Sequence, residues 1–436
     1  MEPLSLQKAV ISMSPRTYLG SEMSTILRSV SAVDLGLANM ARMPAAMAPL
    51  ALVLAEGHSR RALAAGSLLV AAFTLGEIFF SAPLARLGDR LEVRRALVRL
   101  MLPLALLWAV FGLLAPHFAN GLVFGALLVM AIPIGGLGAG LFGIARVLIV
   151  GGHRSAPGRL TMERLVALDT SLMEVFFFVA PMLVSASIVV GGPAFAAFSV
   201  TFVGAAGLAL LAAVPARPWA SATAPVGAEA PASSRAKGSV WLSRERAWVF
   251  VASSAMGIAE GGFIVAVPSI LVEKHLALGY AGLIVGLLSV GSVIGGLAVA
   301  KRPALINRIP LRRRLAILLL GLAVGVSLVS LLHSVVAMAV GTLLAGSFVA
   351  PLNTTRALAM QSLVSKAQKS EGFGALYGSY SIGFAAVGVA LGFLGTIFRA
   401  ADILLVMTSL SIAVAAYLIA VRPNHGVSAL RLRRAA

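Results

Sequence analysis

The sequence predicts an all-α membrane protein: twelve transmembrane helices in two six-helix, pseudo-symmetric bundles. Hydrophobic residues make up 59% of the 436 residues and charged residues only 12%, which is about half the charged share of a soluble domain. The apolar residues fall into twelve runs of about 20 residues, each long enough to cross a bilayer as a helix. One long polar segment separates the first six runs from the last six.

The spans are separated by prolines, glycines or charged residues, which mark nearly every break. The shortest break lies between the fifth and sixth spans, where only Gly191, Gly192 and Pro193 intervene. The expected spans are 30–55, 62–84, 96–115, 120–149, 165–190, 194–215, 247–271, 278–300, 315–333, 336–362, 373–397 and 402–421.

The polar segment 216–245 is rich in alanine, proline and serine, a composition typical of flexible linkers. The two halves also resemble each other weakly: Gly76 and Gly291 each precede a basic loop, and Pro133 and Pro351 occupy similar positions. A duplicated bundle is a common architecture of transporters. We therefore expect an N-terminal segment 1–29, a first bundle 30–215, the linker 216–245, a second bundle 246–421 and a basic tail 422–436.

The distribution of basic residues predicts the orientation. If the N-terminus is cytoplasmic, the cytoplasmic segments hold 30 of the 35 lysines and arginines, Arg356 among them, the outer loops hold four, and Arg42 lies in the first span. The positive-inside rule then places both termini in the cytoplasm. This pattern also explains the net charge of +19 without nucleic acid as a partner.

Several chemistries are not expected. The chain has no cysteine, which excludes disulfides and thiolate metal sites, and its N-terminal residues lack the pattern of a cleavable signal peptide. It contains no phosphate-binding loop, zinc-protease motif or nucleophile elbow. We therefore expect no cofactor, no metal, no catalytic residue and no enzymatic activity.

Four ionisable residues lie near the middle of expected spans: Arg42, Glu77, Glu174 and Glu260. Each costs about 2.5–3.5 kcal/mol to insert, so such residues are functional candidates. We interpret the three glutamates as candidates for proton coupling. The alternative is structural: Arg42 pairs with Glu77 or Glu174, and Glu260 is a buried, hydrogen-bonded carboxyl.

Other polar and small residues in the spans have two possible roles. Polar side chains can contact substrate or can join helices to one another, and glycines three or four residues apart allow helices to approach closely. The substrate-cavity candidates are Arg42, Asn39, Asn353, Tyr377 and Tyr380. The glycine patterns are Gly135-Gly136-Leu-Gly138-Ala-Gly140, Gly291-x-x-x-Gly295 and Gly374-x-x-x-Gly378.

The loop after the second span resembles a motif of the major facilitator superfamily, G-x-x-x-D-R-x-G-R-R. Here Asp89, Arg90 and Arg94 match, whereas Ala85 and Glu92 replace the two glycines. Further stretches resemble an efflux-type bacterial branch of that superfamily, and together the resemblance covers about 30–421. These stretches are Arg42-Met-Pro44, Ala167 to Glu174, Ala180-Pro181, Gly291 to Gly296 and Ala350-Pro351.

The resemblance implies alternating access between two rigid halves of a monomer in the bacterial cytoplasmic membrane. It also implies that Asp89, with Arg90 and Arg94, forms a conformational latch against the helix that starts near Gly372. A carboxylate is favourable at a helix N-terminus. The alternative is that these residues are solvated loop charges that only set the topology.

We therefore hypothesise a secondary transporter that exports a small, partly apolar, cationic or neutral molecule in exchange for protons. Its partners would be this substrate, protons and membrane lipid. A proton symporter that takes up a metabolite is the alternative within transport. A membrane-embedded enzyme is a weaker alternative because the outer loops are short and nearly free of acids. A transporter-like scaffold would gain nothing from charges within the membrane.

Overall fold

The computed structural model describes residues 32–55, 57, 59–91, 93–152, 162–213, 246–301, 308–364 and 369–420. Within these ranges the chain is helical apart from short connections and contains no strand. Twelve helical segments of the described ranges are long and apolar enough to cross a membrane. The predicted fold class and number of spans are confirmed. The expected segments 1–29, 216–245 and 422–436 lie outside the described residues.

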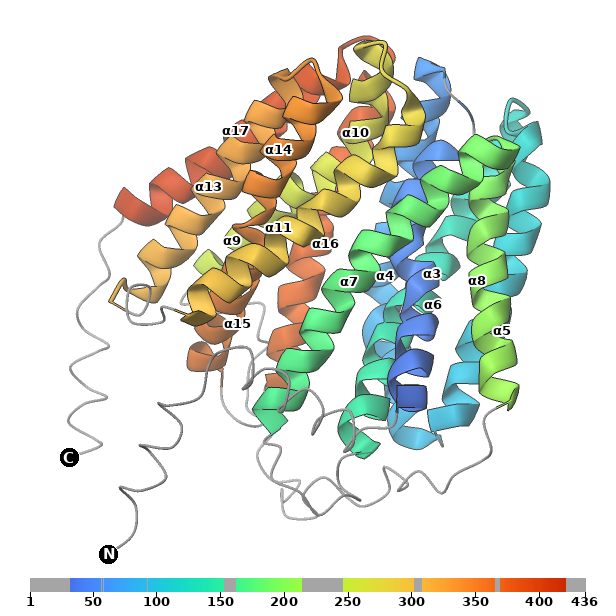
Figure 1. The fold of residues 1–436 in the computed structure, drawn as a ribbon, viewed down its shortest axis with the longest axis horizontal. Helices are drawn as coiled ribbons and strands as arrows, with labels where there is room; N and C mark the ends of the chain where they lie inside the picture. The colour runs from blue at the N-terminus through green and yellow to red at the C-terminus, as the bar shows by residue number, and fades with distance from the viewer. Residues whose placement is uncertain are drawn as a thin grey trace, which may run out of the picture.

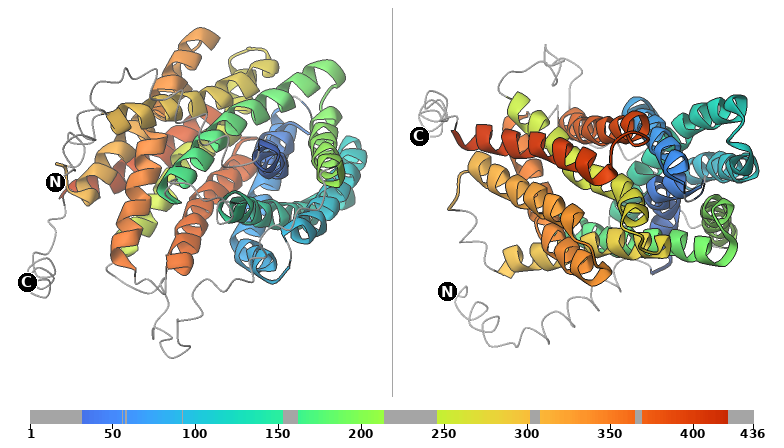
Figure 2. Two further views of the ribbon diagram at one scale, coloured as in Figure 1. Left: turned by 60° about the horizontal axis from the view of Figure 1, so that its bottom comes forward. Right: turned by 90° about the horizontal axis from the view of Figure 1, so that it is seen from above.

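The first six spans form one group of helices, which we call the N-terminal group. They lie together on one side of the molecule, coloured blue to green in Figures 1 and 2. Their helices are α3 (Ala32–Leu54), α4 (Arg60–Arg90), α5 (Val93–Leu114), α6 (Gly121–Gly152), α7 (Met162–Gly191) and α8 (Ala194–Ala213).

The last six spans form the C-terminal group, coloured yellow to red on the other side of the molecule (Figure 2). Its seventh span consists of α9 (Ala247–Met256), a π-helical turn (Gly257–Gly261) and α10 (Gly262–Glu273). The others are α11 (Ala281–Lys301), α13 (Leu311–Leu331), α14 (Val335–Gly346), α15 (Val349–Leu363), α16 (Lys369–Leu394) and α17 (Ala400–Ala420).

The tenth span is broken, although the sequence predicts one continuous helix over 336–362. Helix α14 ends at Gly346, and α15 begins at Val349. Pro351 lies in the first turn of α15. Because proline has no backbone N–H, it cannot donate to the carbonyl of Ser347, four residues earlier, which favours a break at this point.

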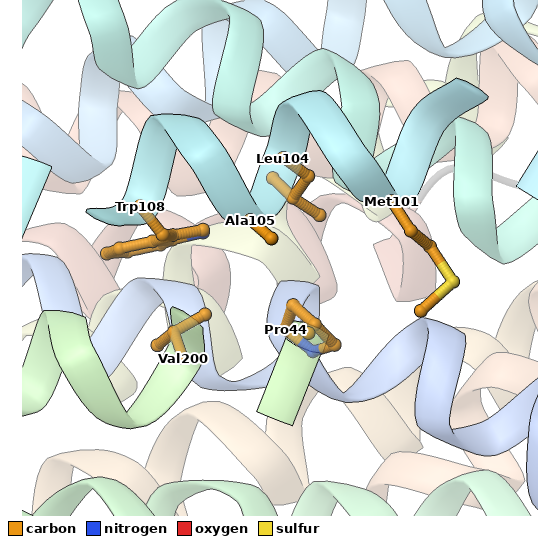
Figure 3. Close-up of a pocket in the computed structure, with 7 residues that line it drawn as sticks. Pro44, Met101, Leu104, Ala105, Trp108 and Val200 are labelled. Atoms are coloured by element: carbon orange, nitrogen blue, oxygen red, sulfur yellow. The ribbon is translucent and has the colours of Figure 1, made fainter. Parts of the chain in front are cut away.

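The centre of the N-terminal group is a packed core. Trp108 of α5 is fully buried and lies with Leu104 and Met101 against Pro44 of α3 and Val200 of α8 (Figure 3). The crevice among these side chains has no room for a water molecule. These residues therefore hold α3, α5 and α8 together and do not form a binding cavity.

Glycines allow α4 and α6 to cross at close range. A Cβ atom on Gly76 would lie 1.8 Å from the carbonyl oxygen of Ile132, and one on Gly135 would lie 1.9 Å from that of Phe73. The expected contacts of Gly291 and Gly295 are also confirmed. Cβ atoms there would lie 2.2 and 1.8 Å from the carbonyl oxygens of Leu343 and Ser347, respectively.

Gly76→Ala is expected to destabilise the purified protein, because the added methyl meets the rigid backbone of α6. Overpacking of this kind costs about 1–3 kcal/mol. Thermal unfolding in detergent measures the change. The control is Gly125→Ala in α6, where a Cβ meets nothing within 4 Å, so its melting temperature should stay unchanged or rise. Equal melting temperatures for the two variants would contradict the close crossing of α4 and α6.

Candidate functional site

The two groups meet mainly along two helix pairs, α4 with α16 and α7 with α11, and α10 makes smaller contacts with α3 and α4. We call the end of the molecule with the α3–α4, α10–α11 and α16–α17 connections the distal end. The helix ends at Ala32 and Ala420 lie toward the other end, which we call the terminal end (Figure 1). The contacts between the groups are described below from the distal end inward.

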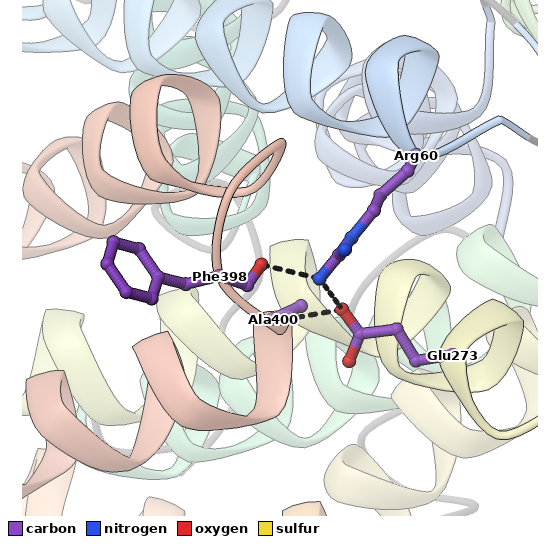
Figure 4. Close-up of polar contacts among 4 residues, drawn as sticks. All are labelled: Arg60, Glu273, Phe398 and Ala400. Atoms are coloured by element: carbon purple, nitrogen blue, oxygen red, sulfur yellow. Dashed lines mark hydrogen bonds and ion pairs between the residues drawn. The ribbon is translucent and has the colours of Figure 1, made fainter.

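At the distal end, one arginine joins the two groups (Figure 4). Arg60, the first residue of α4, donates from Nη2 to the carbonyl oxygen of Phe398 at 2.7 Å and lies 3.5 Å from Oε1 of Glu273. The same carboxylate oxygen accepts from the backbone N–H of Ala400 at 2.6 Å. A carboxylate at the N-terminus of α17 is electrostatically favourable. Glu273 therefore connects the start of α17 to Arg60 of the N-terminal group.

Lys274, the next residue, caps α13. Its ammonium group donates to the carbonyl oxygens of Ser330 and Leu332 at the end of that helix. Burial lowers the pKa of Lys274 below its ordinary value, the positive charge of Arg399 lowers it further, and Glu273 opposes both effects. The pair Glu273–Lys274 thus fixes the distal ends of α10, α13 and α17 relative to one another.

Helices α7 and α11 also meet closely toward the distal end. The backbone N–H of Gly282 donates to Oγ of Ser185 at 2.7 Å. A Cβ on Gly282 would lie 2.1 Å from the carbonyl oxygen of Pro181, and one on Gly279 would lie 2.9 Å from Cγ2 of Val189. Together with Arg60, these contacts close the distal end of the interface between the groups.

Deeper in the molecule, Glu77 of α4 is buried at the contact with α16 and is 7% exposed. Its Oε1 accepts from the hydroxyl of Tyr377 at 3.0 Å, and its Oε2 accepts from the hydroxyl of Ser381 at 3.4 Å. Both donors belong to α16. A buried carboxylate of the N-terminal group is therefore satisfied by the C-terminal group.

Glu174 of α7 repeats this arrangement on the other side of the interface, where its Oε1 accepts from the hydroxyl of Ser292 of α11 at 3.0 Å. The hydrogen bonds of Glu77 and Glu174 described here thus come from hydroxyls of the C-terminal group. The expected pairing of Arg42 with one of these glutamates stays a prediction. Arg42 is 2% exposed, and its guanidinium carbon lies 5.9 Å from the ring centroid of Phe142.

Glu260 lies in the π-helical turn Gly257–Gly261. A Cβ on Gly257 would lie 2.0 Å from the carbonyl oxygen of Tyr380, so this turn packs tightly against α16. Such turns insert one extra residue into a helix and are frequent at functional sites. The Glu260 carboxyl interacts with the Tyr380 hydroxyl and with the charges of Arg356 and Glu174. Its Oε2 is buried and has no hydrogen-bond partner in the described part of the chain.

Arg356 of α15 is a site residue that the sequence interpretation missed. Its Nη2 donates to Oδ1 of Asn353 at 2.7 Å, and its guanidinium carbon lies 5.5 Å from the ring centroid of Tyr380. The assignment of Arg356 to the cytoplasmic bases was wrong, because this residue lies inside the tenth membrane span. The expected bounds of that span, 336–362, already include Arg356, so the sequence could have identified it as a charge within the membrane.

The structure therefore brings most of the candidates into one central cluster, which spans both groups. Its members are Glu77 and Glu174 of the N-terminal group, and Glu260, Asn353, Arg356, Tyr377 and Tyr380 of the C-terminal group. The rings of Tyr377 and Tyr380 are stacked with centroids 6.4 Å apart. Asn39 and Arg42 lie buried in α3, each 2% exposed.

The three residues of the expected latch stay a prediction. Asp89 and Arg90 form the end of α4 and do not lie in a loop, and their side chains lie outside the described residues. Arg94 lies near the start of α5 and is half-buried. Among the described residues, no group of histidines and acids is arranged to hold a metal ion.

No protein-family model and no curated protein matches the chain. Solved structures of low sequence identity do match its fold. The nucleoside transporter NupG is 13% identical with a TM-score of 0.62, and the match covers 89% of this chain and 98% of that one. The peptide transporter POT in complex with sulfate is 16% identical with a TM-score of 0.64, over 89% and 93% of the two chains.

A bacterial homologue of the iron transporter ferroportin, solved in an inward-facing state, is 16% identical with a TM-score of 0.59. That match covers 91% of this chain and 99% of the other. All three structures are of transporters, and none is described as an enzyme. The chain therefore has the fold of these transporters, in agreement with the transporter fold that the sequence resemblance implied.

Proposed function

We propose that the protein is a secondary active transporter that works by alternating access and exports a small, partly apolar molecule in exchange for protons. One observation carries this proposal: the hydrogen bonds of two buried carboxylates cross the interface between the groups. Glu77 accepts from Tyr377 and Ser381, and Glu174 accepts from Ser292. When the groups separate at this depth, both carboxylates lose these donors.

The two groups are the halves that move. The contacts of Arg60, Ser185 and Gly279 hold the distal end closed, so access to the central cluster comes from the terminal end. The excess of basic residues on the terminal side supports a cytoplasmic location of that end. In this orientation the conformation faces inward. Both termini then lie on the cytoplasmic side of the bacterial cytoplasmic membrane.

Proton coupling follows from the chemistry of the crossing bonds. A hydroxyl donates a stronger hydrogen bond to an ionised carboxylate than to a neutral acid. Proton binding by Glu77 or Glu174 therefore changes the free energy that joins the halves. Separation of the halves in turn exposes both groups to water, so proton binding and conformation are linked. Glu260 lies beside Glu174 and shares this electrostatic environment.

The export direction is supported by the resemblance to efflux-type sequences, and uptake by proton symport uses the same machinery in reverse. The latch of Asp89, Arg90 and Arg94 belongs to this proposal as the contact that would stabilise the outward-facing form. We propose a monomer, because each chain holds both halves and the complete cluster.

The main test of alternating access measures the distal end directly. Spin labels on Val189→Cys and Gly279→Cys, introduced into this cysteine-free chain, are expected to show a close and a separated population in lipid vesicles. Dipolar broadening detects the close form, and pulsed electron resonance detects the separated form. A matched control pair is Val329→Cys with Gly341→Cys, which lies within the C-terminal group. A Cβ on Gly341 would lie 2.8 Å from Cγ2 of Val329, similar to the distance between Gly279 and Val189.

The control pair should stay close under all conditions, because α13 and α14 belong to the same moving half. Alternating access fails if the distal pair also keeps one close population between pH 5 and pH 8, with and without an imposed proton gradient. That result would favour a static scaffold with a transporter fold.

Arg60→Gln is expected to increase the separated population of the same spin-labelled pair. Arg60 is 43% exposed, and exposed ion pairs contribute about 0.2–1 kcal/mol, so the population ratio should change about 1.4- to 5-fold. Arg61→Gln is the control, because it removes the same charge from the neighbouring, exposed position. An equal effect of both variants would indicate a general charge effect and no specific distal contact.

The double variant Glu77→Gln, Glu174→Gln should strongly reduce the pH dependence of the population ratio. Glutamine preserves the shape and still accepts hydrogen bonds but cannot bind a proton. The wild-type ratio is expected to change with pH, and Asp402→Asn, an exposed carboxylate at the start of α17, should retain that change. A double variant that responds to pH as the wild type does would exclude both glutamates from proton coupling.

A further inference from the structure

We infer that the central cluster binds a small zwitterion, a molecule with an anionic carboxylate and a cationic ammonium group. The inference rests on the proposed transport function and specifies its substrate class. Its basis is a pair of opposite charges, Arg356 and Glu260, each of which has buried polar atoms without a protein partner.

The guanidinium group of Arg356 is only partly satisfied. Nη2 donates to Asn353 at 2.7 Å, and the ring of Tyr380 lies 5.5 Å from the guanidinium carbon. Nε and Nη1 are buried and donate to no group in the described residues. An anionic acceptor is the ligand that such a guanidinium binds best.

The carboxyl of Glu260 has the complementary deficiency, because its Oε2 is buried and accepts no hydrogen bond. The other two carboxylates of the cluster already have donors: hydroxyls of α16 for Glu77 and a hydroxyl of α11 for Glu174. A ligand ammonium group therefore finds its acceptor at Glu260, and the nearby negative charge of Glu174 adds to the attraction.

Arg356 and Glu260 do not satisfy each other. Their charges interact, but no ion pair between them is found among the described residues. A ligand with only a cation would leave the Arg356 donors unpaired, and a ligand with only an anion would leave Oε2 of Glu260 unpaired. Unpaired buried polar groups weaken binding, so a zwitterion that bridges the two residues is the complementary ligand.

Part of the cluster lies at an exposed surface. Tyr377, whose hydroxyl contacts Glu77 across the interface, is 39% exposed. The stacked rings of Tyr377 and Tyr380 also offer an aromatic surface to the apolar part of a ligand.

The test uses sets of compounds that differ only in charge. Glycine, phenylalanine and alanyl-phenylalanine are each compared with their C-terminal amide, their N-acetyl form and their N-acetyl amide. Calorimetric titration of the purified protein in detergent gives the Kd values. For at least one size we expect the zwitterion to bind about tenfold or more tightly than either singly charged form, because each block leaves a buried group unpaired.

Two variants connect this preference to the two residues. Arg356→Gln should reduce the ratio of the Kd of the amide to the Kd of the zwitterion to about one. Glu260→Gln should reduce the ratio of the Kd of the N-acetyl form to the Kd of the zwitterion to about one. Arg313→Gln, an exposed arginine at the start of α13, should change neither ratio. Melting temperatures of the ligand-free variants show that they are folded.

The inference is overturned if amide and zwitterion bind equally, if only the cationic forms bind, or if no compound of any size binds. These results are separate from the test of the transport function. If the spin-labelled distal pair shows both close and separated populations but no zwitterion binds, the transport function is retained and this substrate class is rejected. Zwitterion binding by a protein fixed in one conformation would reject transport and retain the site.

Discussion

The hydrogen bonds between buried carboxylates of the N-terminal group and hydroxyls of the C-terminal group are the interaction on which the rest of the structure depends. Glu77 and Glu174 lie on α4 and α7, the two helices of the N-terminal group that make the most extensive contacts with the other group. A carboxylate at membrane depth needs a partner, and here the partner belongs to the opposite half. The same bonds therefore satisfy the buried charge and hold the halves together. As a result, the pairing of the buried charge depends on how the two halves are arranged.

Close helix packing makes these bonds possible. Gly76 and Gly135 bring α4 against α6 within the N-terminal group, and Gly257 brings the π-helical turn against α16 within the C-terminal group. In a membrane, such packing replaces much of the hydrophobic effect that joins helices in water. The result is two closely packed groups, with polar side chains gathered where they meet. The packed crevice around Trp108 shows the same principle in a purely apolar form.

Much of the fold and part of the site could be predicted from the sequence. Span length and the charge between spans gave the twelve helices, and the cost of a charge in the bilayer identified Glu77, Glu174 and Glu260. The interpretation was wrong about Arg356, because a basic residue near a helix end was assigned to the cytoplasmic surface. It could not foresee that hydroxyls of the opposite group are hydrogen-bond donors to Glu77 and Glu174, because complementary chemistry in a sequence does not show which residues are neighbours in space. The break at Pro351 was missed, since the apolar run continues through it.

The sequence by itself determined the number of membrane helices, the all-helical class and the presence of ionisable residues within the spans. These properties follow from composition along the chain, because the bilayer acts on each segment separately. Only the tertiary structure decided that Glu77 meets Tyr377 and Ser381, that Glu174 meets Ser292, and that Glu260 and Arg356 share one cluster. Such contacts join residues up to 304 positions apart, and they depend on how the helices pack and rotate against one another, which no local pattern of the chain specifies.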